Sequence, residues 1–526
     1  MPAVIRTAAA RWRWWHLIAL VLGIAALAAG LWQLLASRAD LEIETSNVDG
    51  VPVTLFAPLD AASSDAPIVI VGHGFAGSRQ LMQPFALTLA RSGYRAVTFD
   101  FPGHGDNPTP LKGKIGSDQR TGLLLAALSK VVAHARTLPG GDRPLALLGH
   151  SMAGDIAVRY AQEAAGGTAA IVAVSPYLSQ QMGADGPPNV LFIYGSLEPG
   201  IILEQGREAV AAVAGGPPDQ LATGVTYGNF ESGTARRLVV ADNVEHIGVL
   251  YSPTALATAR DWLNRAFGRE GAPDAGAAPA AIGGALGLFY LGVILIAWPL
   301  ARLLPRVAEP PRGAGLGWRP FLRAAVAPAV LTPLILWPVP NDFLPIAIGD
   351  YIALHFAVYG LLTWLGLWLA GVRDGPRQGR FSWRAFAVAV IAVAVFETLA
   401  LMLPTDVFVA SFVPGADRLI VLLVLLAGVL LWATADEWIT RGPGAPRLGY
   451  GITKVLFVVS LMLAVFLNRN ELFFLVIIIP AMLALFIVYG LFSGWIYRRT
   501  GHPWVAAVTN ALAFAAAITV SFPIAE

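Results

Sequence analysis

The sequence predicts a protein in two parts. One is an α/β domain with a mostly parallel sheet and helices on both faces; the other is an all-α polytopic membrane domain, with about nine transmembrane helices in total. Three observations lead to this fold class. Hydrophobic residues make up 56% of the 526 residues and charged residues 13%, whereas soluble domains contain about 25% charged residues. The apolar residues gather in runs near the ~20 residues that cross a bilayer. Only residues 40–267 alternate short β-branched runs with helical segments, the pattern of parallel strands and crossover helices.

Charge and cysteine content exclude several classes. The 36 basic and 34 acidic side chains give a net charge of +2, so the chain lacks the bulk charge that grips nucleic acid, and no nucleic-acid partner is expected. There are no cysteines, which excludes a disulfide scaffold, a zinc–thiolate site and a cysteine nucleophile. We expect no cofactor and no metal.

The N-terminal 36 residues predict a membrane anchor. Residues 1–14 carry Arg6, Arg11 and Arg13 and are expected in the cytoplasm, and residues 15–36 are almost purely apolar. The exit "LLASRAD" matches a signal-peptidase site poorly, so we expect the helix to remain uncleaved.

Residues 40–267 contain six strand-like runs and at least three helical segments. The expected strands are 68–71, 96–99, 145–148, 170–174, 190–194 and 238–240, and the expected helices are 122–136, 153–165 and 201–213. A Gly/Ala/Pro-rich linker follows at 268–281.

Residues 282–526 predict eight further transmembrane helices. They are expected at 282–304, 321–339, 344–371, 385–404, 418–437, 452–467, 472–496 and 503–522. With the N-terminus in the cytoplasm, the short inner segments hold 17 Lys and Arg residues and the outer ones three. The positive-inside rule therefore places the α/β domain on the outer face. The composition fits a bacterial inner membrane, in which case this domain would be periplasmic.

The segment "LALLGHSMAG" has the pattern of a nucleophile elbow, a tight turn between a strand and a helix that projects a serine hydroxyl over the sheet. Ser151 would be the nucleophile. Gly149 fits the tight turn, and Ala153 replaces the last glycine of the usual G-x-S-x-G pattern.

A general base and its acid follow in the order that such folds use, serine, acid, histidine. Glu198 comes just after the strand 190–194, and His246 lies in the loop after the strand 238–240. Because strand ends on one edge of a parallel sheet meet, the three side chains are expected together. Asp219, Asp242 and Glu204 remain alternatives for the acid. The glycine-rich loop at 72–74 and the amide of Met152 could supply oxyanion donors.

Together, "VIVGHGFAGS", "YRAVTFDFPGHGDN", "LLGHSMAG", "VLFIYGSLEP" and "VEHIGVLYS" resemble the α/β-hydrolase family, in particular its dienelactone-hydrolase-like and serine-aminopeptidase-like branches, over residues 45–266. The resemblance implies a Ser151–Glu198–His246 triad and an oxyanion hole formed by the amides of Phe75 and Met152. His73, Gly74 and Gly149 would shape the loops around it. Many relatives insert a helical cap between the strands 170–174 and 190–194, and the ~15 residues here leave no room for one.

The membrane half carries ionisable residues whose role is open. Asp350 and His355 lie 140° apart on one helix, so a direct pair is not expected, and acids such as Glu397 are expected to bridge helices or face water. "DEWITR" at 436–441 is similar to the acidic motif of CAAX-type intramembrane proteases, but Thr509 and Asn510 stand where that family has a histidine.

These features predict a membrane-integrated serine hydrolase acting on a small-molecule or lipid-like ester, with the lipid bilayer as its other partner. An acyltransferase with the same triad is an alternative. A transporter or scaffold with a non-catalytic hydrolase-like domain is another.

Overall fold

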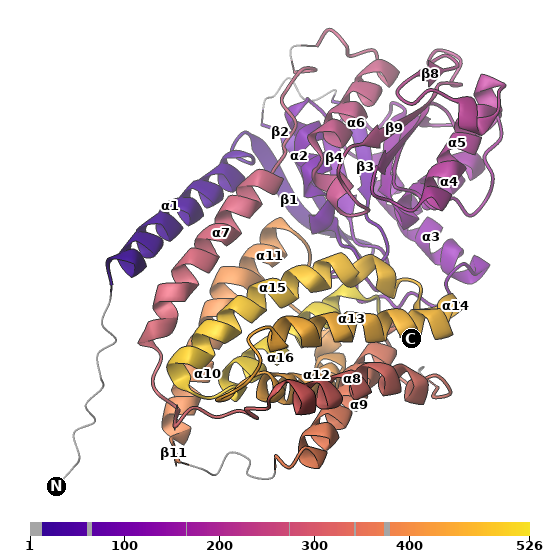
Figure 1. The fold of residues 1–526 in the computed structure, drawn as a ribbon. Coiled ribbons are helices and arrows are strands. Elements are labelled where there is room, and N and C mark those ends of the chain that lie inside the picture. Colours follow the sequence, from indigo (N-terminus) through magenta and orange to yellow (C-terminus); the bar gives the residue numbers. More distant parts are fainter. Residues whose placement is uncertain are drawn as a thin grey trace.

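The computed structural model describes residues 13–59, 66–164, 166–272, 274–340, 343–372 and 379–525. Figure 1 shows an α/β domain seated at one end of a bundle of long helices, with α1 and α7 running side by side along one flank. Arg6 and Arg11 of the expected cytoplasmic segment lie outside the described residues.

The α/β domain is built on a nine-stranded sheet of order β1-β2-β4-β3-β5-β6-β7-β9-β8. The six strands from β4 to β9 along this order are parallel, and β1, β2 and β8 are antiparallel additions at the two ends. The strands are β1 Leu41–Val48, β2 Val51–Pro58, β3 Ile68–Gly72, β4 Arg95–Phe99, β5 Leu145–His150, β6 Thr168–Val174, β7 Val190–Gly195, β8 Thr226–Tyr227 and β9 Arg236–Ala241.

Helices cover both faces of this sheet. They are α2 Gln83–Arg91, α3 Asp118–Ala135, α4 Met152–Glu163, α5 Gly200–Ala214 and α6 Pro253–Ala266. Val69 and Val71 of β3 pack with α2 and α6, whereas Ile68 and Ile70 pack with α3, α4 and α5. Because both faces of the central strands are buried, these strands read as continuous apolar runs rather than as alternating patterns.

The hairpin formed by β1 and β2 was not expected from the sequence. Its turn lies at Asp49 and Gly50, with φ of 48° and 88°, the left-handed conformation that two-residue hairpin turns require. Six consecutive residues of β1 are exposed. An edge strand of this kind lacks the apolar run that identifies the central strands.

Nine helices in the described part of the chain are long and apolar enough to cross a membrane, which indicates a multi-pass membrane protein. The helices are α1 Trp14–Ala36, α7 Gly283–Leu300, α8 Trp318–Leu336, α9 Gly349–Leu369, α10 Trp383–Glu397 continued by α11 Leu403–Phe408, α12 Leu419–Ile439, α13 Gly449–Leu467, α15 Leu475–Thr500 and α16 Trp504–Ser521. The short helix α14 spans Arg469–Leu472, and β10 Ala308–Glu309 pairs with β11 Arg380–Phe381.

The α/β domain is docked on the bundle rather than only tethered to it. The backbone of Ile524, after α16, accepts a hydrogen bond from Leu111 N (2.8 Å) and donates one to Gly103 O (2.9 Å). Ser411 N, in the segment before α12, donates to Ser78 Oγ (3.0 Å). Gly103 and Ser78 follow β4 and β3, so the bundle meets the carboxyl edge of the sheet, where folds of this kind place their sites.

Candidate active site

Ser151 occupies the corner between β5 and α4. Its backbone has φ 52° and ψ −115°, a conformation that a non-glycine residue adopts only under constraint from its surroundings. The constraint comes from close backbone packing. A Cβ on Gly149 would lie 2.3 Å from the carbonyl oxygen of Ala153, and one on Gly154 would lie 2.8 Å from Pro176 Cβ. The small residues of this motif are therefore a steric requirement of the corner.

Glu198 and His246 form a hydrogen-bonded pair beyond β7 and β9. His246 Nδ1 lies 2.9 Å from Glu198 Oε2, and the glutamate side chain is fully buried. The other carboxylate oxygen, Oε1, accepts hydrogen bonds from Ser175 Oγ (2.5 Å) and Gly195 N (2.7 Å). Three donors thus fix the orientation of this carboxylate, and the carboxylate fixes the imidazole.

His246 lies next to the end of β5, the strand that leads into Ser151. The ring of His150, the residue before Ser151, lies 4.8 Å from the His246 ring, and His150 Nε2 lies 2.9 Å from the His246 carbonyl oxygen. Burial and the neighbouring His246 hold the pKa of His150 well below its usual value. A neutral His150 can donate from Nε2 to the carbonyl of His246 and so hold the base's own backbone.

The loop after β3 packs closely against Ser151. A Cβ on Gly74 would lie 2.9 Å from Ser151 Cβ, so only glycine allows the approach. His73 is fully buried; its Nδ1 lies 2.8 Å from Gly74 O, and its Nε2 accepts a hydrogen bond from Phe101 N (3.1 Å). Met152 is the first residue of α4, where a backbone N–H has no acceptor within the helix. Met152 directly follows Ser151, and Gly74, the residue before Phe75, packs against it. The two amides expected to bind the oxyanion thus belong to segments next to Ser151.

A second buried network supports this loop from the side of β4. Asp100 forms an ion pair with Arg79 and accepts a hydrogen bond from Arg79 N (2.7 Å). His104 Nδ1 lies 3.0 Å from Pro102 O, and its ring lies 5.1 Å from the His73 ring. Burial lowers the pKa of both histidines, that of His104 strongly. These groups hold the loops in place and do not reach the triad.

The structure brings Glu198, rather than Asp219, Asp242 or Glu204, against His246. Ser175 was not anticipated as a partner of Glu198. It follows β6 with φ 48°, and nothing in "AVSPYL" distinguishes its hydroxyl from that of any loop serine.

The mouth of the site has no helical cap from its own domain, since residues 175–189 contain turns but no helix. Large apolar side chains instead stand exposed on the segments that follow β6 and β7, two of them in loops and one at the start of α5. They are Tyr177, Leu197 and Ile201, which are 60%, 65% and 72% exposed. These three residues form an apolar rim at this edge of the sheet.

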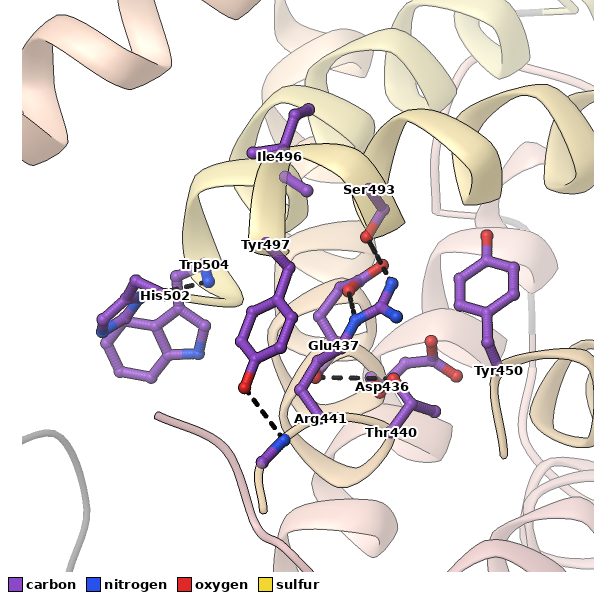
Figure 2. Close-up of polar contacts among 12 residues, drawn as sticks. Asp436, Glu437, Thr440, Arg441, Tyr450, Ser493, Ile496, Tyr497, His502 and Trp504 are labelled. Atoms are coloured by element: carbon purple, nitrogen blue, oxygen red, sulfur yellow. Dashed lines mark hydrogen bonds and ion pairs between the residues drawn. The ribbon is translucent and has the colours of Figure 1, made fainter. Parts of the chain in front are cut away.

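The two adjacent acidic residues near the end of α12 are paired with basic residues of the helical bundle. Glu437, on α12, contacts Arg441 (3.0 Å) and accepts a hydrogen bond from Ser493 Oγ (2.5 Å), while Asp436 forms an ion pair with Lys454. Figure 2 shows Glu437 of α12, Arg441 just after that helix and Ser493 of α15 pointing toward one another. Asp350 accepts hydrogen bonds at the start of α9, and His355 lies 3.1 Å from Ser460 Oγ. Among the described residues, no three His, Asp or Glu side chains are grouped as a metal site would need.

Three comparisons with known proteins bear on this site. The serine aminopeptidase family S33 matches residues 63–208. Esterase YjfP of Escherichia coli (strain K12) is 35% identical over 65 residues, which cover 12% of this chain and 26% of the esterase. The matched stretch thus spans about a quarter of that relative.

Solved structures of similar architecture include a dienelactone hydrolase from Anabaena variabilis and a bacterial membrane phospholipase A. The first is 16% identical with a TM-score of 0.29 and covers 43% of this chain and 96% of its own. The second is 15% identical with a TM-score of 0.30 and covers 48% of this chain and 99% of its own.

The predicted fold class is confirmed. The α/β domain has the α/β-hydrolase fold and is joined, in the part of the chain that the structure describes, to nine apolar helices. The family match and the esterase relative indicate a hydrolase. No comparison supports the resemblance of the membrane half to CAAX-type proteases.

Proposed function

We propose that this protein is a membrane-integrated serine hydrolase that cleaves an ester or related acyl bond through a covalent acyl-enzyme. The observation that carries the proposal is the contact between a fully buried Glu198 and His246 at the same sheet edge as the strained corner of Ser151. A carboxylate that orients an imidazole beside a serine on a strand-to-helix turn is the arrangement that makes a hydroxyl nucleophilic.

The reaction would proceed in two halves. Ser151 Oγ attacks the acyl carbonyl as His246 takes its proton, and the amides of Phe75 and Met152 stabilise the oxyanion. His246 then protonates the departing alcohol, which leaves the acyl group on Ser151. A water gives its proton to His246 and attacks the acyl-enzyme, and collapse of the second oxyanion releases the acid and returns the proton to Ser151. Glu198 stays ionised and holds the imidazole throughout.

The substrate would be a small or lipid-like acyl compound. The apolar rim supports this class. A site at a domain junction beside a bilayer would meet amphiphilic molecules, so the bilayer is the second partner we propose.

Hydrolysis of p-nitrophenyl esters of increasing chain length by the full-length protein in detergent tests the proposal. Wild type should release p-nitrophenol, and Ser151→Ala, which removes only the hydroxyl, should not. Ser129→Ala, an exposed serine on α3, is the matched control and should keep full activity. Turnover that persists in Ser151→Ala would contradict the proposal. Adding an alcohol acceptor and analysing products distinguishes hydrolysis from acyl transfer.

The excess of Lys and Arg in the short inner segments supports one orientation of the protein in the membrane. We propose that the N-terminus is cytoplasmic and that the hydrolase domain lies on the outer, periplasmic face of a bacterial inner membrane. Because the chain has no cysteine, a single introduced cysteine reports the side of the membrane on which that one residue lies. In intact cells with a permeable outer membrane, an impermeant maleimide should label Glu163→Cys on α4 and not Arg498→Cys near the end of α15. The reverse pattern would show the opposite orientation.

A further inference from the structure

The loop that follows β3 carries Phe75, and we call it the oxyanion loop. One aromatic side chain of this loop packs against the membrane domain. The Phe75 ring lies 4.7 Å, centroid to centroid, from the ring of Phe474 and 6.4 Å from that of Phe522. Phe474 lies between α14 and α15, and Phe522 caps the C-terminal end of α16. The residue whose amide is proposed to bind the oxyanion is therefore packed against two elements of the helical bundle.

Membrane-domain contacts also fix the neighbouring loop. The buried guanidinium of Arg418, just before α12, donates to Gly103 O (2.5 Å) and Gly105 O (3.4 Å) as well as to Phe522 O (3.0 Å). Between those glycines, the His104 ring lies 5.8 Å from the Phe75 ring. Arg418 thus ties the loop that supports Phe75 to the same end of α16 that touches Phe75.

Two side chains of its own domain also contact the Phe75 ring. The Arg120 guanidinium lies 5.5 Å from the ring centre, and the His104 ring lies 5.8 Å from it. The next residue, Ala76, has φ 60°, so the loop turns sharply directly after Phe75. The carbonyl side of the Gly74–Phe75 peptide is held by its own loop, because Gly74 O accepts a hydrogen bond from Gly77 N (3.1 Å) and lies 2.8 Å from His73 Nδ1. The side chain of Phe75 is held from the membrane domain, by Phe474.

We propose that Phe474 is a positioning residue for acyl transfer: by packing on Phe75 it aims the Phe75 amide at the oxyanion, so the membrane domain completes the active site. The proposal rests on the proposed function. An oxyanion donor stabilises charge only when it lies within about 2.7–3.1 Å of the developing oxygen. A misplacement of about 1 Å caused by a residue away from the reacting atoms can cost about 100-fold in rate. The role of the eight-helix domain then goes beyond anchoring.

This role predicts an effect on the rate of the chemical step rather than on substrate binding. The oxyanion exists only in the transition state and intermediate, so a mis-aimed donor lowers kcat and leaves KM nearly unchanged. A residue that only lined the acyl pocket would instead change KM, and would do so according to chain length. The two roles are therefore separable by kinetics.

The experiment measures kcat and KM of the full-length protein in detergent with a short and a long p-nitrophenyl ester. Phe474→Ala should lower kcat about 10- to 100-fold with both esters, with KM within about two-fold of wild type. Phe474→Tyr, which keeps the ring, should restore most of the rate. The matched control is Phe473→Ala, because Phe473 is 46% exposed and its ring contact is with Phe474 rather than Phe75; it should be near wild type.

Three outcomes would overturn the proposal. Phe474→Ala could keep the wild-type kcat, Phe473→Ala could lose as much rate as Phe474→Ala, or KM could rise for the long ester alone. Should Phe474→Ala be poorly folded, Phe474→Leu in a protein with wild-type thermal stability decides the same question. Ser151→Ala separates the two proposals. Activity that survives this change refutes the proposed function, whereas a serine-dependent activity indifferent to Phe474 refutes only the positioning role.

Discussion

At the scale of single residues, the environment of Glu198 decides what His246 can do. The carboxylate has no solvent exposure, and each of its oxygens is held by at least one donor, Ser175 Oγ and Gly195 N on Oε1 and His246 Nδ1 on Oε2. Charge-assisted hydrogen bonds of this kind are stronger than neutral ones. The imidazole is therefore held in the tautomer that leaves Nε2 free to accept a proton, as a general base requires.

Substitutions around this carboxylate should lower kcat to different extents. Glu198→Gln removes the charge and should lower kcat by about 100- to 10,000-fold, because the amide cannot stabilise the imidazolium. Ser175→Ala removes one of the hydrogen bonds to this carboxylate but leaves its charge, and should lower kcat about three- to ten-fold. Steady-state hydrolysis of a short ester measures both, with Ser129→Ala as the reference. Equal rates for Glu198→Gln and wild type would assign the acid to another residue.

Three buried histidines should make the domain less stable in acid. Burial lowers the pKa of His73, His104 and His150 from the usual 6.5. Below about pH 6.5 the unfolded chain therefore binds protons that the folded chain does not, so the free energy of unfolding falls as the pH drops, by up to about 1.4 kcal/mol per pH unit for each residue. Thermal unfolding in detergent between about pH 7.5 and 5 should show this loss. His104→Gln should flatten the slope, and an unchanged slope would count against the burial effect.

At the scale of elements, the corner between β5 and α4 is the most constrained feature. Gly72 and Gly149 pair across β3 and β5, and a Cβ on Gly72 would lie 2.8 Å from Ala153 Cβ. The strand, the turn and the helix are therefore packed at backbone distance. The strained backbone of the half-buried Ser151 is a consequence of this packing rather than of its own contacts.

Two glycine substitutions separate the corner from an ordinary helix position. Gly149→Ala should destabilise the protein by about 1–3 kcal/mol and distort the nucleophile, because its Cβ would lie 2.3 Å from Ala153 O. Gly122→Ala on α3, where a Cβ would meet nothing within 4 Å, should be neutral or stabilise by up to about 1 kcal/mol. Unfolding midpoints and ester hydrolysis check both. A harmless Gly149→Ala would mean that the turn is looser than its geometry implies.

The helices and strands that were predicted well are those with a recognisable pattern of apolar residues in the sequence. Each expected central strand overlaps an observed strand, from β3 to β9, because strands buried on both faces are continuous apolar runs. The long apolar helices were predicted because a bilayer crossing needs about 20 consecutive apolar residues. The β1–β2 hairpin was missed because β1 is mostly exposed. The serine, acid and histidine could be proposed because each directly follows a strand, but the Ser175 hydroxyl has no local signature.

At the scale of the whole molecule, the two parts share one core. The hydrophobic cluster on the α2 and α6 face of the sheet includes Phe85 and Trp262 and continues through Leu34 of α1 and Phe289 of α7 into the bundle. The segment after α16 also contacts the α/β domain, through backbone hydrogen bonds of Ile524. None of this is visible in the sequence, since contacts such as Arg418 to Gly103 join residues more than 300 positions apart. Composition predicts that a membrane domain exists, and only the folded chain places it against the oxyanion loop.

The most direct measurement is the site of covalent labelling by a fluorophosphonate probe, mapped by peptide mass spectrometry on the full-length protein. A serine activated by His246 and Glu198 should carry the probe at Ser151 and nowhere else, and the label should vanish in His246→Ala as well as in Ser151→Ala. Absence of label on a folded wild-type protein, or a label that survives in His246→Ala at the wild-type rate, would contradict the account.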